Sequence, residues 1–242
     1  IEFSVYDISG EDVDLIMQLA AAAKDRGASV LDMIPENLKS LLDCDVLVML
    51  IDASRVTTDI NDPRYKEMIE YDNLMAALIS LVAMYRSRVY GITKPRKLYP
   101  VFVFTKFDAV DKKVLRALGI PDDLHGWFTR YSMDRKLIHE KLTAFMKRFF
   151  EHSLAITYGG TIMGVELERA RPFVSYLMTE LDPEEGIPVP KVVRAPDGIS
   201  YELVYSRSEY RRFIDYFGSI AGEIKKAQRL PEEAGSVTGL GR

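Results

Sequence analysis

Four consecutive residues, Thr105-Lys106-Phe107-Asp108, bring a hydroxyl, an ammonium group and a carboxylate together at the end of an apolar run. The run is Val-Phe-Val-Phe over residues 101–104, so both faces of a strand there would be apolar. Such a strand is typical of the centre of a parallel sheet that helices cover on both sides. Ligands bind at the carboxyl ends of strands in open α/β sheets. We therefore expect a ligand site at Thr105, Lys106 and Asp108; the alternative is an exposed loop with ordinary charges.

The sequence Thr105-Lys106-x-Asp108 resembles the [N/T]KxD motif of the Ras-like and translation-factor GTPases, which belong to the P-loop nucleotide-binding proteins. In that family the aspartate accepts two hydrogen bonds from the guanine edge, the lysine lies along the purine ring, and the first residue braces the phosphate loop. The resemblance implies that Lys106 and Asp108 read guanine and that Thr105 supports the nucleotide site. Because so short a string is common, a second motif in the right order is needed.

A second motif of the same family follows a short predicted strand at the beginning of the chain, where residues 7–10 read Asp-x-x-Gly. In the family's DxxG motif the aspartate holds a water molecule on Mg²⁺ and the glycine amide contacts the γ-phosphate. The resemblance thus implies that Asp7 serves the metal and Gly10 the nucleotide. The string recurs at Asp123 and Asp215, but neither of these follows an apolar strand.

Glu11 stands where many members of the family have a glutamine that orients the attacking water. The resemblance makes Glu11 a candidate catalytic residue, since a carboxylate also accepts a hydrogen bond from water. The alternative is an acidic residue in the first turn of a helix, where the helix dipole favours it.

Ser175 and Tyr176 end another short apolar segment, Phe-Val over residues 173–174. The segment resembles the approach to the Ser-Ala loop of GTPases, in which a backbone amide reads the guanine O6 atom. Tyr176 occupies the position where alanine is usual. The alternative is that Ser175 is an ordinary strand residue.

The sequence GxxxxGK[ST], the P-loop that cradles the phosphates, does not occur in this chain. A domain without it hydrolyses nucleotide at no useful rate, because phosphoryl transfer depends on positioning and charge stabilisation. In the family this loop precedes DxxG. We expect the P-loop to lie upstream of Ile1, which reads as mid-strand; the alternative is a degenerate, catalytically inactive module.

The composition is that of an ordinary globular protein: 242 residues, 48% apolar and 28% charged. The net charge of -4 gives no general footprint for nucleic acid.

The single Cys44 is expected to be a small buried hydrophobe, and it fits a reducing, cytoplasmic setting, with peripheral attachment to a membrane left open. The apolar run over residues 74–84 is shorter than the roughly 20 residues of a membrane span and predicts a buried helix. The three histidines match no metal-site spacing.

One basic cluster contains Arg86, Arg88, Lys94, Arg96 and Lys97. A nucleic-acid or phosphate site is one interpretation. A solvated helix end is favoured, because cations stabilise a helix C-terminus.

The remaining pattern supplies elements to position these residues. A strand over residues 46–51 is expected to be fully buried and to end on Asp52, a structural cap or loop brace. A hairpin is expected with Gly159-Gly160 at its turn. Trp127 is expected to be a core anchor in a connecting loop, and a capping box is expected at Ser206 to Glu209. Helices are expected over residues 12–25, 35–42, 65–88, 109–118 and 131–150 and after Ser206; further strands are expected over residues 154–158, 161–167 and 199–204, with Pro- and Gly-bearing loops around 182–198.

The sequence therefore predicts an α/β fold: a mostly parallel sheet in a three-layer domain with helices on both faces, over residues 1–230, with a flexible tail over 231–242. The predicted function is that of a guanine-nucleotide-binding regulatory protein that uses GTP or GDP and Mg²⁺ and contacts a protein effector or complex. The alternatives are an inactive scaffold that keeps the GTPase fold and an unrelated doubly wound enzyme with its site at the same sheet edge.

Overall fold

A computed structural model of the chain describes Leu15, Gln18 and residues 34–91, 97–130, 135–158, 160–195 and 197–236. Asp7, Gly10 and Glu11 lie outside these residues, as does most of the helix expected over residues 12–25.

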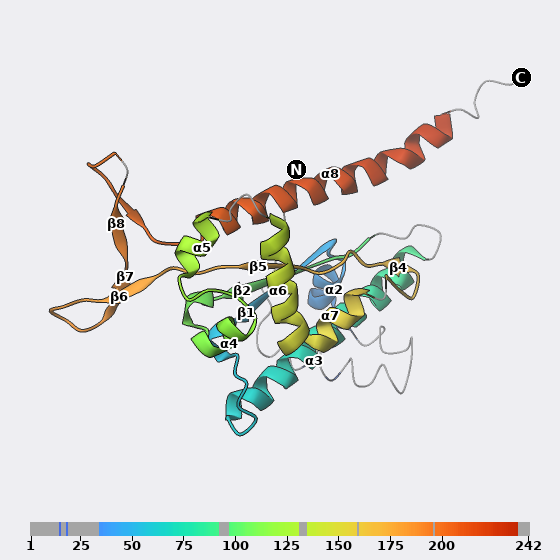
Figure 1. Cartoon of the computed structure of the whole chain (residues 1–242). Helices are drawn as coiled ribbons and strands as arrows, with labels where there is room; N and C mark the ends of the chain where they lie inside the picture. The colour runs from blue at the N-terminus through green and yellow to red at the C-terminus, as the bar shows by residue number, and fades with distance from the viewer. Residues whose placement is uncertain are drawn as a thin grey trace, which may run out of the picture.

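A three-stranded parallel sheet lies at the centre, in the order β1 (Val46–Asp52), β2 (Tyr99–Thr105), β5 (Arg171–Val174) (Figure 1). The first six residues of β2 are buried. Phe102 and Phe104 belong to the larger hydrophobic core, whereas Val101 and Val103 belong to a second core on the other face. The prediction of a central parallel strand that is covered on both faces is confirmed.

The first covering layer consists of α3 (Pro63–Tyr90), α6 (Arg135–Phe149) and α7 (Glu151–Tyr158) (Figure 1). The Asp62 side chain accepts the backbone N–H of Arg64 at the start of α3, and Gly91, with φ of 66°, ends the helix. Among the described helices, only α3 is long and apolar enough to cross a membrane, judged by length and composition alone. Half of its most apolar 18-residue stretch is buried inside the protein. It packs here as the buried helix that the sequence predicts.

The second covering layer is α8 (Arg207–Ser236). Its aromatic side chains pack against Val101, Val103 and Phe173 on the far face of the sheet. The helix continues past Pro231, so the tail predicted over residues 231–242 begins inside it.

Three further α-helices are short: α2 (Glu36–Leu42), α4 (Lys112–Ala117) and α5 (Leu124–Arg130). α2 confirms the helix expected over residues 35–42. Trp127 is a buried core residue as predicted, but it belongs to α5 instead of a loop.

Two local predictions are wrong. The strand expected over residues 154–158 is α7, because Leu154 and Thr157 are buried at helical spacing and α3 supplies the helix with an N-terminal cap. The hairpin that follows pairs β3 (Thr161–Ile162) with β4 (Val165–Glu166) and turns at Met163 and Gly164, with φ of 48° and 83°. Two positive φ values are typical of the type I′ turn, which closes many two-residue hairpins.

β1 is also less buried than predicted. It alternates, with Val48 39% and Leu50 62% exposed. In the described part of the chain β1 pairs only with β2, and α8 packs mainly over β2 and β5. One face of β1 therefore keeps apolar exposure that an interior strand would lose.

The basic cluster is not wholly solvated. Arg86 is 1% exposed and donates to the carboxylate of Asp45 at 2.9 Å and to the carbonyl of Cys44. Lys97 pairs with Glu168 and Glu166. Lys94 and Arg96 lie outside the described residues. Arg86 therefore ties α3 to the start of β1, and the interpretation as a solvated helix end is wrong for this residue.

Two hairpins project from the body between β5 and α8, on the left of Figure 1. The first pairs β6 (Thr179–Leu181) with β7 (Pro188–Pro190), and the second pairs β8 (Val192–Arg194) with β9 (Tyr201–Leu203). Residues 177–204 are called the arm below. The sequence predicts loops and short strands here but not the pairing of four strands into two hairpins.

Candidate functional site

The carboxyl ends of β1 and β2 lie side by side at one edge of the sheet, because Asp52 is the register partner of Thr105. The hydroxyl of Thr105 donates to the carbonyl of Ile51 at 3.2 Å. Thr105 thereby ties the two strand ends together, at the edge where parallel sheets bind ligands.

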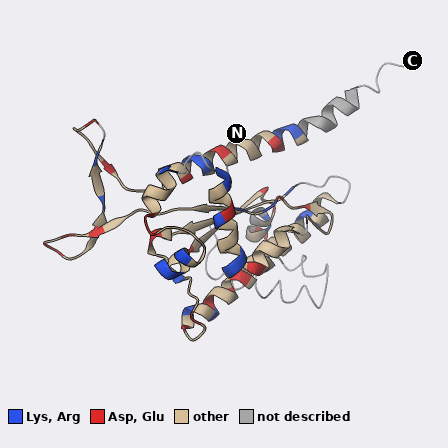
Figure 2. Cartoon of the chain, in the orientation of Figure 1, with Lys and Arg blue, Asp and Glu red and all other residues tan. Residues whose placement is uncertain are grey.

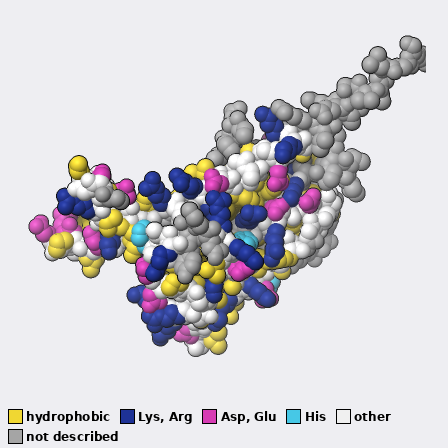
Figure 3. All heavy atoms as spheres, turned by 45° about the horizontal axis from the view of Figure 1, so that its top comes forward, with side chains coloured by type: hydrophobic (Ala, Val, Ile, Leu, Met, Phe, Trp, Pro, Cys, Tyr) yellow, Lys and Arg dark blue, Asp and Glu magenta, His cyan; other side chains and the backbone are white. Residues whose placement is uncertain are grey.

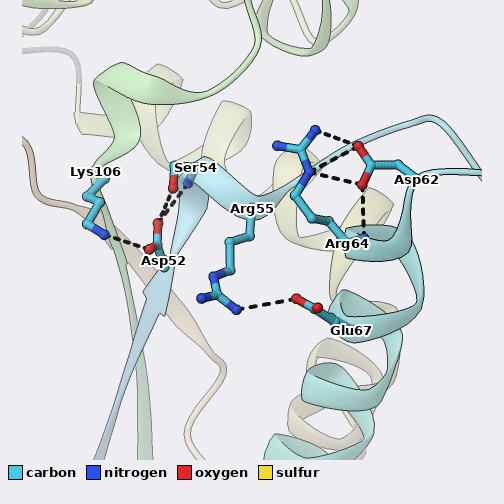
Figure 4. A network of polar contacts seen from close by, with 7 residues as sticks. All are labelled: Asp52, Ser54, Arg55, Asp62, Arg64, Glu67 and Lys106. Carbon is cyan, nitrogen blue, oxygen red and sulfur yellow. Dashed lines mark hydrogen bonds and ion pairs between the residues drawn. The ribbon is translucent and has the colours of Figure 1, made fainter.

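Lys106 follows in the left-handed conformation, with φ of 51° and ψ of 38°. This region is costly for a residue with a Cβ atom. Its Nζ atom donates to Oδ2 of Asp52 at 2.8 Å, as Figure 4 shows, and the side chain is 66% exposed. Backbone strain of this kind collects at functional sites.

Asp52 is a brace, as predicted. Its Oδ1 atom accepts from the backbone N–H of Ser54 at 3.1 Å and from the Ser54 hydroxyl at 2.5 Å (Figure 4). Burial alone would raise the pKa of Asp52, but the hydrogen bonds from Lys106 and Ser54 outweigh it, so the pKa lies below its usual value. Asp52 is therefore an ionised anchor that holds the ammonium group of Lys106 at the edge.

Asp108 has a different environment. It lies in a short 3-10 helix, Phe107–Ala109, and is partly buried. Within the described part of the chain no side chain pairs with its carboxylate. Burial raises the pKa of Asp108, and only its own backbone amide opposes that rise. A desolvated carboxylate without a side-chain partner is the arrangement that a hydrogen-bonding ligand would complete.

The loop after β5 meets this site. The backbone N–H of Phe107 donates to the carbonyl of Ser175 at 3.3 Å, and the N–H of Ser175 donates to the carbonyl of Phe104 at 2.8 Å. The fold thus brings Thr105, Lys106 and Asp108 together with Ser175 and Tyr176, which are about seventy residues later in the chain.

Tyr176 does not present a free amide to this site. Its N–H donates to Oγ of Ser206 at 3.1 Å, and its ring is buried, with its centroid 5.8 Å from that of Phe128. Burial raises the pKa of the Tyr176 phenol, and nearby carboxylates, Glu209 first, raise it further. The amide that the resemblance assigns to guanine O6 is already hydrogen-bonded.

A helix begins directly after Ser206, as the sequence predicts, but the side chains of Ser206 and Glu209 have other partners than predicted. Their spacing indicates a capping box at the start of α8, in which the two side chains cap the helix itself. Instead Ser206 accepts from Tyr176, and the carboxylate of Glu209, 1% exposed, accepts from the N–H of Val174 at 3.4 Å and pairs with Arg212 at 2.6 Å. Both side chains fix the end of β5.

Within the described residues no group of three or more His, Cys, Asp and Glu side chains could hold a metal ion. Asp7, the residue assigned to Mg²⁺ by resemblance, lies outside that part.

A second polar cluster lies away from the sheet edge, where α3 meets α7. Asp72, 3% exposed, accepts from the backbone N–H groups of His152 and Ser153, both at 2.9 Å. The Nδ1 atom of His152 lies 3.0 Å from the same carboxylate, and the Ser153 hydroxyl donates to it at 2.5 Å. Asp72 is therefore the N-terminal cap of α7, supplied by another helix, and lines a pocket of about 310 Å³ with His152.

No protein-family model, no curated protein and no solved structure matches this chain.

Proposed function

We propose that this chain is part of a guanine-nucleotide-binding regulatory domain of the P-loop GTPase type, and that it supplies the base-reading edge of the site. The observation that carries the proposal is Asp108: a partly buried carboxylate whose pKa burial raises, at the carboxyl edge of a parallel sheet, without a side-chain partner in the described residues. Guanine offers two adjacent N–H donors that match the two oxygens of one carboxylate.

The order of the strands supports the same reading. The resemblance requires the strand that ends on Asp52, the strand that leads into Lys106 and the strand that leads into Ser175 to follow one another along the chain, and these three are parallel neighbours in the sheet. Lys106 is largely exposed at that edge, so its alkyl chain is accessible to a purine ring.

GTP or GDP with Mg²⁺ is the proposed ligand, with Asp7 and Gly10 serving metal and γ-phosphate and Glu11 near the attacking water. Hydrolysis is proposed only for a protein that also supplies GxxxxGK[ST], and the partner is then a protein effector that senses the bound nucleotide.

The second candidate is an inactive scaffold that keeps the fold. The observation in its favour is Tyr176, whose amide donates to Ser206 and whose ring fills the core beside Phe128. A guanine O6 atom would have to displace the Ser206 hydroxyl to reach that amide.

Calorimetric titration of the complete natural protein with GDP and with xanthosine diphosphate, in Mg²⁺, tests the proposal. Asp108→Asn removes two charge-assisted hydrogen bonds to guanine, so GDP affinity should fall at least about 100-fold. The affinity of xanthosine diphosphate for the variant should equal or exceed its affinity for the wild type, because the asparagine amide donates to the xanthine carbonyl.

Asp111→Asn is the matched control. Asp111 caps α4 through the N–H of Lys113, and asparagine caps helices as well as aspartate does. This variant should bind GDP as the wild type does. Equal loss of both nucleotides in Asp108→Asn, or no GDP binding by the wild type, would favour the scaffold.

A further inference from the structure

The arm carries more exposed apolar surface than its fold needs. Ile199 is 86%, Tyr201 70% and Leu181 69% exposed. Within residues 177–204 only Ala195 and Val204 are buried among those described. Two-stranded hairpins are marginally stable alone, and monomeric proteins rarely expose a large contiguous apolar patch. The arm is therefore a candidate interface.

The arm is nevertheless an ordered structure. At its base Met178 donates to Val204, Lys191 to Met178 and Val204 to Lys191, through backbone hydrogen bonds of 2.8 to 3.0 Å. At its tips Asp182 accepts from two backbone N–H groups, and Asp197 accepts from two more. These bonds hold the hairpins in the conformation that a partner would meet, which lowers the entropy cost of binding.

The charge of the arm restricts the partner. Residues 177–204 contain six carboxylates and only two basic side chains, Lys191 and Arg194. Figure 3 shows acidic and hydrophobic side chains interleaved over the hairpins. Anionic lipid would be repelled, so the surface fits a protein face that is apolar and basic. The carboxylates are Glu180, Asp182, Glu184, Glu185, Asp197 and Glu202.

This same chain presents such a face on α8. Arg207, Tyr210, Arg211 and Ile214 are exposed and recur at helical spacing, and Ile214 is 68% exposed. Figure 2 shows basic residues over the beginning of α8. The one acidic residue beside them, Asp215, pairs with Arg135 of α6 at 3.3 Å. The face is thus apolar with net positive charge, complementary to the arm.

The arm and α8 leave the body from neighbouring points and run in roughly opposite directions (Figure 1). A two-fold axis near that junction would lay the arm of each copy along α8 of the other. Such an interface is closed and self-complementary, as most protein dimers are. We propose that this protein forms a two-fold dimer in which the arm of each copy packs on the exposed face of α8 of its partner. The proposal does not depend on nucleotide binding.

Sedimentation velocity of the full chain from about 1 to about 100 µM tests this, since that range covers interfaces of ordinary strength. We expect a concentration-dependent dimer that weakens as salt is raised. The double substitution Ile199→Ser and Tyr201→Ser should raise the dissociation constant at least about tenfold, as should Ile214→Ser on α8. Ile60→Ser is the matched control, because Ile60 is equally apolar, 71% exposed and outside both surfaces; it should change nothing.

Mixing the arm variant with the Ile214→Ser variant gives the decisive result. In the mixed dimer both defects fall in one of the two contacts, and the other contact is intact. The mixture should therefore associate more tightly than either variant alone. A monomeric wild type, a dimer that tolerates both variants, or a mixture no tighter than its components would each overturn the proposal.

Discussion

Asp72 and Asp108 are two inward-lying aspartates of one fold with opposite surroundings. Asp72 lies within α3 and has two hydrogen-bond partners on each oxygen, from the backbone and side chains of His152 and Ser153. Asp108 lies at the sheet edge, and no described side chain pairs with it while burial raises its pKa. The first carboxylate completes the fold, whereas the second has no side-chain partner in the described part of the chain.

The difference in hydrogen bonding distinguishes a carboxylate that stabilises the fold from one that is available to a ligand. A buried carboxylate with complete hydrogen bonding stabilises the structure that surrounds it, and its loss leaves several donors unsatisfied. A carboxylate that is desolvated without hydrogen bonds or ion pairs to offset the cost lowers the stability of the fold. Such a residue is typical of sites where function requires it. Substitutions at the two sites should therefore change stability in opposite directions.

The largest effect is expected for Asp72→Ala. Removing the cap leaves the N–H groups of His152 and of the buried Ser153 without acceptors, and the free energy of unfolding should fall by about 3 kcal/mol. Urea unfolding followed by circular dichroism measures the change. The matched control is Asp62→Ala, which removes a partly exposed cap of α3 and should cost much less. Equal losses of unfolding free energy in the two variants would mean that burial of the Asp72 cap adds nothing to stability.

A smaller effect is expected from the backbone of Lys106. Lys106→Gly should be more stable than Lys106→Ala by about 1 kcal/mol, because both lose the ion pair to Asp52 but only alanine keeps the cost of the left-handed conformation. Met163, with φ of 48° in an exposed turn, offers the same comparison without a proposed function. If alanine equals glycine at position 106 but not at position 163, the sheet edge is unstrained.

The sequence predicts the sheet edge better than it predicts the arm or the hairpin turn. The unbroken apolar run over residues 101–104 and the charged string after it are local signals, and the strand and its loop lie where they indicate. The hydrogen bonds from Tyr176 to Ser206 and from Val174 to Glu209 join residues 30 and 35 positions apart, so a spacing rule read them as a helix cap. The sequence predicts a strand where α7 lies, because the cap of α7 comes from Asp72, 81 residues before Ser153. Residues distant in the sequence determine the roles of Ser206 and Glu209 and the helical structure of α7, so no local sequence pattern predicts either.

The smallest effect, and the sharpest contrast with Asp72, is expected for Asp108→Asn. Because burial raises the folded-state pKa of Asp108, its protonated form is favoured in the folded protein, and its contribution to stability is present at low pH and is lost as pH rises through that pKa. The neutral amide avoids this loss. Asp108→Asn should therefore be slightly more stable than the wild type at pH 7, by well under about 1 kcal/mol because solvent still reaches the side chain.

That gain should disappear on acidification to about pH 3, where the carboxyl group is protonated in both states. Urea titrations of the two proteins at both pH values measure it, and Asp111→Asn gives the background for an exposed aspartate. A variant that loses stability at pH 7 would place Asp108 with Asp72, as a residue whose partners serve the fold. A variant that gains stability while guanine recognition falls would separate folding from ligand binding at a single carboxylate, which is what the proposed base-reading edge requires.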